Sequence, residues 1–473
     1  MRKFILAAAT TASAGALALA GLGASAAQAA TTHAKVTTDT VAEGVVTSAD
    51  FKIGSCSGTV SVTFTPALAS GSSVQAVKAN ATEVRLAGVF AVTASTQTYS
   101  VAIKCSSAGT TTVAVKATTG PAPADVVGVG SDTIQNVTDQ FSADFNHGKG
   151  ATAAHLYSWD ATNPVTGAIG DPISTKIGCT AIPRPDGSSQ GITALTTENQ
   201  TLPTGTGFCM DFARSSRDRA STDPTSISFV DLAGDGITYS TQATTNAPGN
   251  LTTADLTGIY NCTITNWDQV GGANATIDPY IPQPGSGTRS FFLSAIGVPT
   301  PGACVTDDNG NLQENEGVNP VLNDPNGVFP YSIGKYLAER YHSPKCLNTA
   351  CTAVNGVTCK PASGKNLFGC DTHGTMVLHM INGTNPTVPF PLTNSTTKAV
   401  INTAFTSSFL RTLFEVVQGP ESGGVGTIPT YLQPFFGPTG YVCTNTTAKK
   451  DLANYGFAVL PAGTAPGDCG SAH

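Results

Sequence analysis

The hydrophobic pattern of this chain changes once, and that change constrains the fold more than any other feature. Before residue 118, apolar and polar residues alternate with a period of two in several short runs, which is typical of half-buried β-strands. After residue 125, short apolar runs alternate with segments of helical period. Between them, Thr118–Asp125 (TTGPAPAD) has the proline and glycine content of a linker. We expect a multidomain chain with an all-β unit at 30–117, a linker at 118–125 and an α/β part at 126–473.

The first unit is expected to be an immunoglobulin-like β-sandwich. Its period-two runs include Val60–Phe64, Tyr99–Ile103 and Val113–Val115. Cys56 and Cys105 each adjoin one of these runs, so an inter-sheet disulfide between them is expected. Because no catalytic arrangement is visible in this unit, the expected role is a spacer or a surface-binding module.

The N-terminus has the pattern of a secretory signal at 1–29. Arg2 and Lys3 precede an apolar run that ends in Ala27-Gln28-Ala29. No cysteine follows at which a lipid could be attached, and no later run of about 18 apolar residues could span a bilayer. The net charge of −7 argues against nucleic-acid binding. We expect a monomer that is exported freely, either extracellular or associated with the cell wall.

The twelve cysteines all lie after the signal, and an even number in an exported chain favours disulfides. Local pairs such as Cys443 with Cys469 fit this expectation. Zinc is the alternative for four of them with His342 or His373 nearby, but their spacings lack the short pairs of zinc sites. We therefore expect no metal at Cys346, Cys351, Cys359 and Cys370.

The α/β part begins with an apolar strand at Val126–Gly130, and Ser131-Asp132-Thr133 is then expected to cap a helix. Further helices are expected at Leu251–Val270, Tyr331–Tyr341 and Lys398–Val417, and the last has the longest apolar stripe. The length of this part suits two lobes better than one.

Two stretches are rich in hydrogen-bond donors. Gly285-Ser286-Gly287-Thr288-Arg289 runs into a helix-capable segment, and the free amides and dipole of a helix start attract anions. Alone, these residues also fit an ordinary capped turn. Asp211–Arg219 (DFARSSRDR) carries arginines whose planar forks suit phosphate or carboxylate. The alternative there is an exposed loop whose arginines pair with neighbouring carboxylates.

Signatures of enzymes match poorly, so no catalytic residue and no cofactor is expected. Pro284 stands where a nucleophile elbow around Ser286 would need glycine, and the chain has neither HExxH nor a phosphate-binding P-loop. Asp307–Glu316 resembles a calcium loop, but Val305 takes the place of its first carboxylate ligand. We expect a solvated loop there.

Three stretches carry a resemblance to a known family: VGVGSDTIQ at Val127–Gln135, DFARSSRD at Asp211–Asp218, and ADLTGIYNCTITNWDQVGG with PQPGSGTRSFF within Ala254–Phe292. In this order and spacing they resemble the phosphate-binding protein of bacterial ABC phosphate importers, a class II periplasmic-type solute-binding protein. The resemblance runs from about residue 125 to the C-terminus. It implies a two-lobed α/β fold with crossing strands and an anion between the lobes, held by Ser/Thr turns from each side.

Carried over to this sequence, the resemblance implies ligand binding by the three turns and their neighbours: Ser131, Asp132, Thr133, Arg214, Ser215, Ser216, Ser286, Gly287, Thr288 and Arg289. Two positions depart from the family pattern. Pro282 stands where the family has an arginine, and Arg289 is the nearest replacement. Ser216 stands where the family has an aspartate that accepts the proton of hydrogen phosphate, and Asp132 or Asp218 would have to substitute.

The leading hypothesis is a secreted binding protein that captures phosphate or a related oxyanion by lobe closure, with an ABC permease or a cell-wall polymer as its partner. Two alternatives stay open. One is a surface or matrix interaction protein built on a retained binding-protein fold. The other is a phosphate-ester hydrolase that uses the same donors.

Overall fold

The computed structural model of the chain describes residues 38–150, 153–342, 368–369, 371–392, 399–418 and 425–473. Within these residues, no helix is both long enough and apolar enough to cross a membrane.

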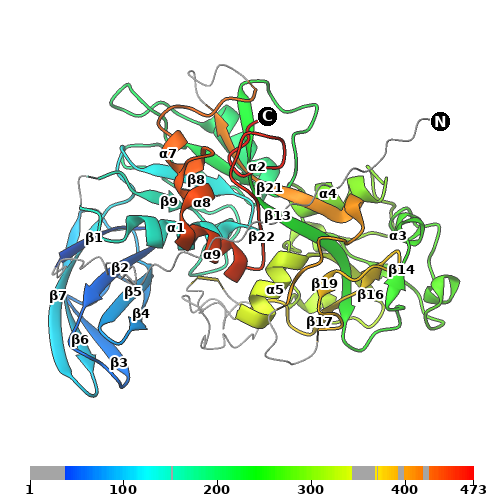
Figure 1. The fold of residues 1–473 in the computed structure, drawn as a ribbon, viewed down its shortest axis with the longest axis horizontal. Coiled ribbons are helices and arrows are strands. Elements are labelled where there is room, and N and C mark those ends of the chain that lie inside the picture. The colour runs from blue at the N-terminus through cyan, green and yellow to red at the C-terminus, as the bar shows by residue number, and fades with distance from the viewer. Residues whose placement is uncertain (1–37, 151–152, 343–367, 370, 393–398, 419–424) are drawn as a thin grey trace, which may run out of the picture. The chain divides into compact units, whose positions relative to one another are not determined.

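The first seven strands form two sheets, one in the order β1-β7-β6-β3 and the other in the order β2-β5-β4 (Figure 1). Their inward side chains, such as Phe51, Leu86, Val101 and Val115, are fully buried in one shared apolar core. The strands that the period-two pattern predicts are therefore confirmed. Their bounds are β1 (Thr38–Ala42), β2 (Val46–Lys52), β3 (Val60–Thr65), β4 (Ser73–Asn80), β5 (Glu83–Val89), β6 (Gln97–Cys105) and β7 (Gly109–Thr118).

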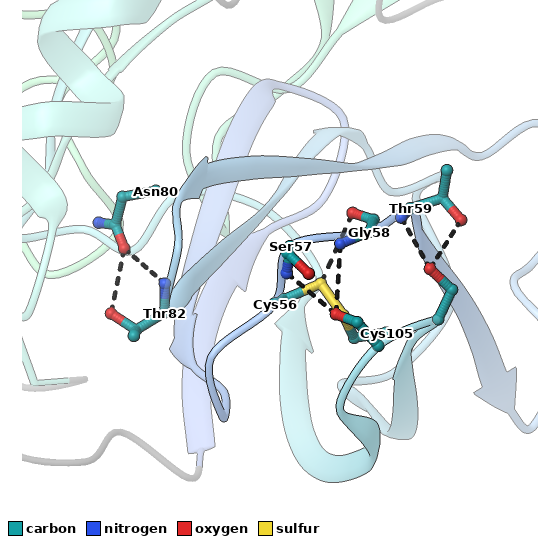
Figure 2. Close-up of a disulfide and its surroundings, with 9 residues drawn as sticks. Cys56, Ser57, Gly58, Thr59, Asn80, Thr82 and Cys105 are labelled. Carbon is teal, nitrogen blue, oxygen red and sulfur yellow. Dashed lines mark hydrogen bonds between the residues drawn. A yellow bond between two sulfur atoms is a disulfide. The ribbon is translucent and has the colours of Figure 1, made fainter.

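Cys56 and Cys105 form a disulfide, with their Cα atoms 5.9 Å apart (Figure 2). Beside it, the Oγ of Ser107 accepts hydrogen bonds from the N–H groups of Ser57 at 3.0 Å and Gly58 at 3.3 Å. Cys56 lies in the loop before β3 and Cys105 ends β6, and these two strands pair in the same sheet. The expected pairing is therefore confirmed, and the bridge ties the connection between β2 of one sheet and β3 of the other to the end of β6.

A nine-stranded sheet dominates the rest of the chain. Its order is β15-β16-β13-β21-β12-β8-β9, and β17 and β22 also pair with β13. The long strands β13 and β21 run antiparallel, with a register shift between Asp231 and Ala233. The bounds are β8 (Val126–Gly130), β9 (Leu156–Ser158), β12 (Phe212–Ser215), β13 (Ile227–Gln242), β15 (Asp278–Pro279), β16 (Gly327–Ser332), β17 (Met376–Leu378), β21 (Leu410–Gln418) and β22 (Ala458–Val459).

Separate apolar cores divide this part into two lobes. The first lobe is built mainly from segments 126–233 and 413–472, and the second from segment 237–409. Strand β13 contributes to both, because Phe229 and Val230 pack in the first lobe whereas Ile237 and Tyr239 pack in the second. The chain therefore has the expected two-lobed fold, with β13 and β21 as strands common to both lobes.

The helices of the first lobe are α1 (Gln135–Asn146), α2 (Ser188–Thr193), α7 (Gln433–Phe436), α8 (Tyr441–Thr444) and α9 (Thr446–Asn454). Those of the second lobe are α3 (Thr253–Tyr260), α4 (Gly287–Ala295) and α5 (Ile333–His342). Helix α3 begins at the expected cap, since Thr252 and Asp255 bond each other's backbone N–H groups. It ends earlier than expected, however, and a short 3-10 helix at Trp267–Val270 follows.

The helix expected at Lys398–Val417 was wrong. Residue 398 lies outside the described residues, and the remainder forms β20 (Val400–Ile401), a 3-10 turn at Ser407–Phe409 and then strand β21. Residues 410–418 pair with β12 on one edge and with β13 on the other, and the strand is buried on both faces along most of its length. The period-four spacing of large apolar residues therefore came from a turn followed by a doubly buried strand.

The capping expected at Ser131-Asp132-Thr133 was also wrong. Helix α1 begins at Gln135 with Ile134 at its cap position, and no side chain caps it. The hydroxyls of Ser131 and Thr133 instead bond a carboxylate from the second lobe.

Three further disulfides join Cys179 to Cys209, Cys262 to Cys304 and Cys443 to Cys469. The four cysteines of the zinc alternative lie outside the described residues. His373 is described, and its Nδ1 bonds the carboxylate of Asp371.

Candidate functional site

Hydroxyl groups from four turns meet at one buried place between the lobes. Ser131 and Thr133 follow β8, Ser188 begins α2 and Ser216 follows β12, all in the first lobe. Ser286 and Thr288 open helix α4 in the second lobe. The six side chains are nearly or fully shielded from solvent. We call these six residues the cradle.

The cradle is closely packed from both sides. The Oγ of Ser216 lies 3.1 Å from that of Ser131 and 3.2 Å from that of Ser188. Gly287 lies against this pair so closely that a Cβ atom there would come within 2.4 Å of both Ser188 Oγ and Ser216 Oγ. Glycine is needed at this position because any side chain would push the start of α4 away from Ser188 and Ser216.

Helix α4 begins as the sequence predicts. Ser286 is its N-cap and its Oγ accepts a hydrogen bond from the N–H of Arg289 at 3.0 Å. The first amides of the helix are therefore directed into the cradle, where the positive end of the helix dipole favours negative charge.

The carboxylate of Glu314 occupies the centre of the cradle. Its Oε1 accepts hydrogen bonds from the hydroxyls of Ser131 at 3.1 Å and Thr133 at 3.2 Å, both in the first lobe. Its Oε2 accepts from the hydroxyl of Ser286 and, at 3.1 Å, from the N–H of Thr288, both in the second lobe. One side chain therefore bonds donors of both lobes at once.

The loop that carries Glu314 is fixed on both sides of it. Leu312 is fully buried in the core of the second lobe, and its carbonyl accepts from the N–H of Gln283 at 2.8 Å. Asn315 adopts a positive φ of 60°, a conformation that asparagine tolerates, and its Nδ2 donates to Thr133 Oγ1 at 3.2 Å. The loop therefore holds the carboxylate in the cradle.

The charge of Glu314 is well compensated. Burial alone would raise the pKa of Glu314, but hydrogen bonds with Asp132 and Ser286 and the charge of Arg411 outweigh it and lower the pKa to about 2. Burial and the neighbouring Glu314 raise the pKa of Asp132 well above its usual value. The pair thus holds one proton on Asp132 and the negative charge on Glu314.

Arg411 contributes the guanidinium of the site, although no local sequence pattern predicts this role. It stands on β21, and both of its terminal nitrogens donate to Thr288 Oγ1 at 3.2 Å. The same side chain donates to the carbonyl of Ser216 at 2.8 Å and forms a buried ion pair with Asp235 at 2.8 Å. Arg411 therefore links the shared strands to the turns of both lobes.

Three residues expected at the site direct their side chains elsewhere. Arg214 is fully buried, but its guanidinium donates to the carbonyls of Gly130 and Ser131 and supports the first turn from behind. Ser215 bonds the backbone of its own turn. Arg289 bonds Asp307 and the carbonyl of Pro282, each at 2.8 Å, and lines a surface groove of about 580 Å³.

Of the two proposed substitutes for the missing aspartate, only Asp132 lies at the cradle. Asp218 is largely exposed and lies 3.1 Å from a ring nitrogen of His473. Ser216 itself lines the cradle, in contact with Ser131 and Ser188.

The solvated loop expected at Asp307–Glu316 was wrong in its second half, because Gln313, Glu314 and Asn315 are buried. Leu312 is the signal that was missed, since an apolar residue in a polar loop often anchors it to a core. Ser188 was missed because the sequence around it, Pro185–Gln190, is also typical of an ordinary turn before a helix.

A second cluster of ionisable groups joins Glu339, Asp371 and His373, whose ligand atoms lie within 4.8 Å of one another. The carboxylate of Glu339 already accepts hydrogen bonds from the hydroxyls of Tyr331 at 2.7 Å and Thr372 at 2.9 Å. Burial raises the pKa of Glu339 to about 7, which disfavours the charged form that a metal ion needs. We assign no metal to this network.

The chain has two lobes that share strands, and hydrogen-bond donors of both lobes converge where the lobes meet. This arrangement defines a two-lobed fold of the periplasmic-binding-protein type. Residues 117–320 match the model of the PBP superfamily domain.

Several solved structures are similar at low sequence identity. An ABC-type phosphate transport receptor from Vibrio cholerae is 16% identical with a TM-score of 0.41, over 71% of this chain and 99% of that one. A putative phosphate ABC transporter substrate-binding protein from Clostridium perfringens, solved with bound phosphate, is 15% identical with a TM-score of 0.43, over 71% of this chain and 99% of that one. A phosphate-binding protein from Stenotrophomonas maltophilia is 12% identical with a TM-score of 0.34, over 72% of this chain and 91% of that one. No curated protein sequence matches the chain.

Proposed function

We propose that the protein binds a small oxyanion between its lobes, and that phosphate is its ligand. The observation that carries this proposal is the convergence of donors from both lobes, including the first amides of α4, on the two oxygens of one buried carboxylate. Such donors suit phosphate as well as carboxylate, because both present several acceptor oxygens with negative charge. Lobe closure would bring the two sets of donors around the anion.

Asp132 supports phosphate over sulfate. It lies half-buried beside the cradle, and its Oδ1 accepts a hydrogen bond from the Nδ2 of Asn315 at 3.3 Å. Burial raises the pKa of Asp132, and the charge of Glu314 raises it further, so departure of Glu314 favours the ionised form of Asp132. An ionised Asp132 would accept the proton of hydrogen phosphate, which sulfate lacks at neutral pH.

We extend the proposal to the whole chain as follows. Residues 1–29 direct export, 30–117 form an immunoglobulin-like unit and 118–125 link it to the binding domain at 126–473. The four disulfides among the described residues support an extracellular or cell-wall location, because such bonds persist in oxidising surroundings. The partner is an ABC permease or a cell-wall polymer, and the protein acts as a monomer without catalysis.

A second candidate function is that of an interaction protein that keeps the fold without capturing a solute. The contacts of Glu314 support this candidate, because a side chain that bonds donors of both lobes can hold the lobes together without any ligand.

Isothermal titration of the exported chain with phosphate and with sulfate tests the proposed function. We expect one phosphate site per chain, weaker binding of sulfate, and at least a tenfold loss of phosphate affinity in Ser131→Ala, since one charge-assisted hydrogen bond contributes roughly 1.5–3 kcal/mol. Ser294→Ala, at an exposed position of α4, is the matched control. If neither the wild type nor a chain with Glu314 replaced binds either anion, the interaction protein becomes the better account.

A further inference from the structure

The cradle already holds an anion, and that anion belongs to the chain itself. Both oxygens of Glu314 are bonded, Oε1 by the first lobe and Oε2 by the second. The Glu314 side chain is only 1% exposed. A free oxyanion cannot use Ser131, Thr133, Ser286 or Thr288 while this carboxylate stays in place.

We propose that Glu314 is a tethered occupant of the cradle, which a free oxyanion must displace before it binds. This inference rests on the proposed function, because it concerns the regulation of the same site. The loop around Glu314 then acts as an internal competitor that sets the concentration at which the protein responds to its ligand.

The contacts of the loop show how the exchange would proceed. The hydroxyl of Tyr331 donates to the carbonyl of Asn315, and the N–H of Ser332 donates to its Oδ1. Because Leu312 is also buried in the core, both ends of the short segment stay attached to the second lobe. Asn311, just before Leu312, is exposed. Glu314 therefore has to leave by local rearrangement of 313–315, after which its charge requires water or a new partner.

Two effects make the carboxylate a strong competitor. A group tethered by a short segment has an effective concentration of about 1 mM or more, so it competes continuously with a dilute ligand. In addition, a phosphate dianion that approaches a cradle containing a carboxylate meets like charge in surroundings of low dielectric constant. The observed affinity of the wild type is the intrinsic affinity multiplied by the fraction of molecules in which the cradle is free.

Phosphate titration of Glu314→Gln tests this inference. Glutamine keeps the size of the side chain but brings no charge, so we expect phosphate affinity at least about tenfold higher than in the wild type. Glu316→Gln makes the same change of charge two positions away on the same loop, and should leave the affinity within about twofold of the wild type. Glu314→Ala provides a second variant, and circular dichroism with thermal unfolding establishes that each chain is folded.

The outcomes separate the two proposals. The proposal that Glu314 is a tethered occupant is supported if both Glu314 variants bind phosphate more tightly than the wild type and the affinity of Glu316→Gln is unchanged. Equal or weaker binding in the Glu314 variants, when the wild type binds phosphate, overturns the inference and makes Glu314 part of the ligand site. If the folded wild type and both folded Glu314 variants fail to bind phosphate or sulfate, the proposed function and the inference both fall.

Discussion

The hydroxyl of Ser131 in the first lobe lies 3.1 Å from the carboxylate of Glu314, which belongs to a loop of the second lobe. The contact crosses the boundary between the lobes and is buried on both sides. In this structure, the proposed anion site is therefore a contact between the lobes that is made by the protein's own carboxylate.

Removal of one cradle donor should destabilise the protein even without a ligand. Ser286→Ala leaves a buried carboxylate oxygen with one donor fewer, which costs roughly 1–3 kcal/mol in the free energy of unfolding. Urea denaturation in phosphate-free buffer measures the effect, with Ser294→Ala as the control. A double-mutant cycle with Glu314→Gln should show coupling, because the variants remove the two partners of one bond. Full stability of Ser286→Ala would mean that the carboxylate does not depend on this donor.

Arg411→Gln should be among the most destabilising single changes in the binding domain. Its ion pair with Asp235 is buried, and removal of one partner from such a pair costs roughly 3–5 kcal/mol. Arg411→Lys should recover only part of this loss, since an ammonium cannot reach Asp235, Thr288 and the Ser216 carbonyl together. Chemical denaturation of the three chains decides the matter, and equal stabilities would show that the pair contributes little.

Arg289→Gln should leave phosphate affinity almost unchanged. The guanidinium bonds Asp307 and the Pro282 carbonyl outside the cradle, and a partly exposed ion pair contributes at most about 1 kcal/mol. Titration of this variant beside the wild type checks the assignment. A tenfold loss of affinity would place Arg289 at the ligand after all.

Stability should fall as the pH rises from about 5 to 8. Burial raises the pKa of Glu415 to about 8, so the folded protein keeps a proton that the unfolded chain releases near pH 4.5. A raised carboxyl pKa therefore contributes stability at low pH, which is lost as the pH rises through this window. Asp186 and Glu339 add to the trend, because burial raises their pKa values to about 6 and 7.

Glu415→Gln isolates one of these groups. Glutamine imitates the neutral acid, so the fall in the free energy of unfolding should be smaller by up to about 1.4 kcal/mol per pH unit. Guanidinium denaturation at pH 5, 6.5 and 8 provides the comparison. Parallel pH profiles for the two chains would show that Glu415 is ionised in the folded protein.

Much of the fold was predictable because it depends on local patterns. The alternation of apolar residues identified the strands of the first unit, and the Thr252 cap located the start of α3. Local patterns failed where a sheet decided the outcome. Residues 410–418 look helical in isolation, and only their position between two neighbouring strands makes them β21.

The candidate site was predictable only in part, for a related reason. The turns around Ser131 and Ser286 could be recognised from short stretches of sequence, because their donors are consecutive. Arg411 and Glu314 reach the cradle from a distant strand and a loop, and no local pattern reveals which of several charged residues will do so. Their roles are a property of the tertiary fold.

The most direct measurement of the central claim is a crystal structure of Glu314→Gln grown with arsenate, a tetrahedral analogue of phosphate whose anomalous scattering locates it. The account predicts one arsenic peak within hydrogen-bond distance of Ser131, Ser286 and the N–H of Thr288. Crystals without such a peak, in which residue 314 still fills the cradle, would contradict the claim that these donors form an oxyanion site.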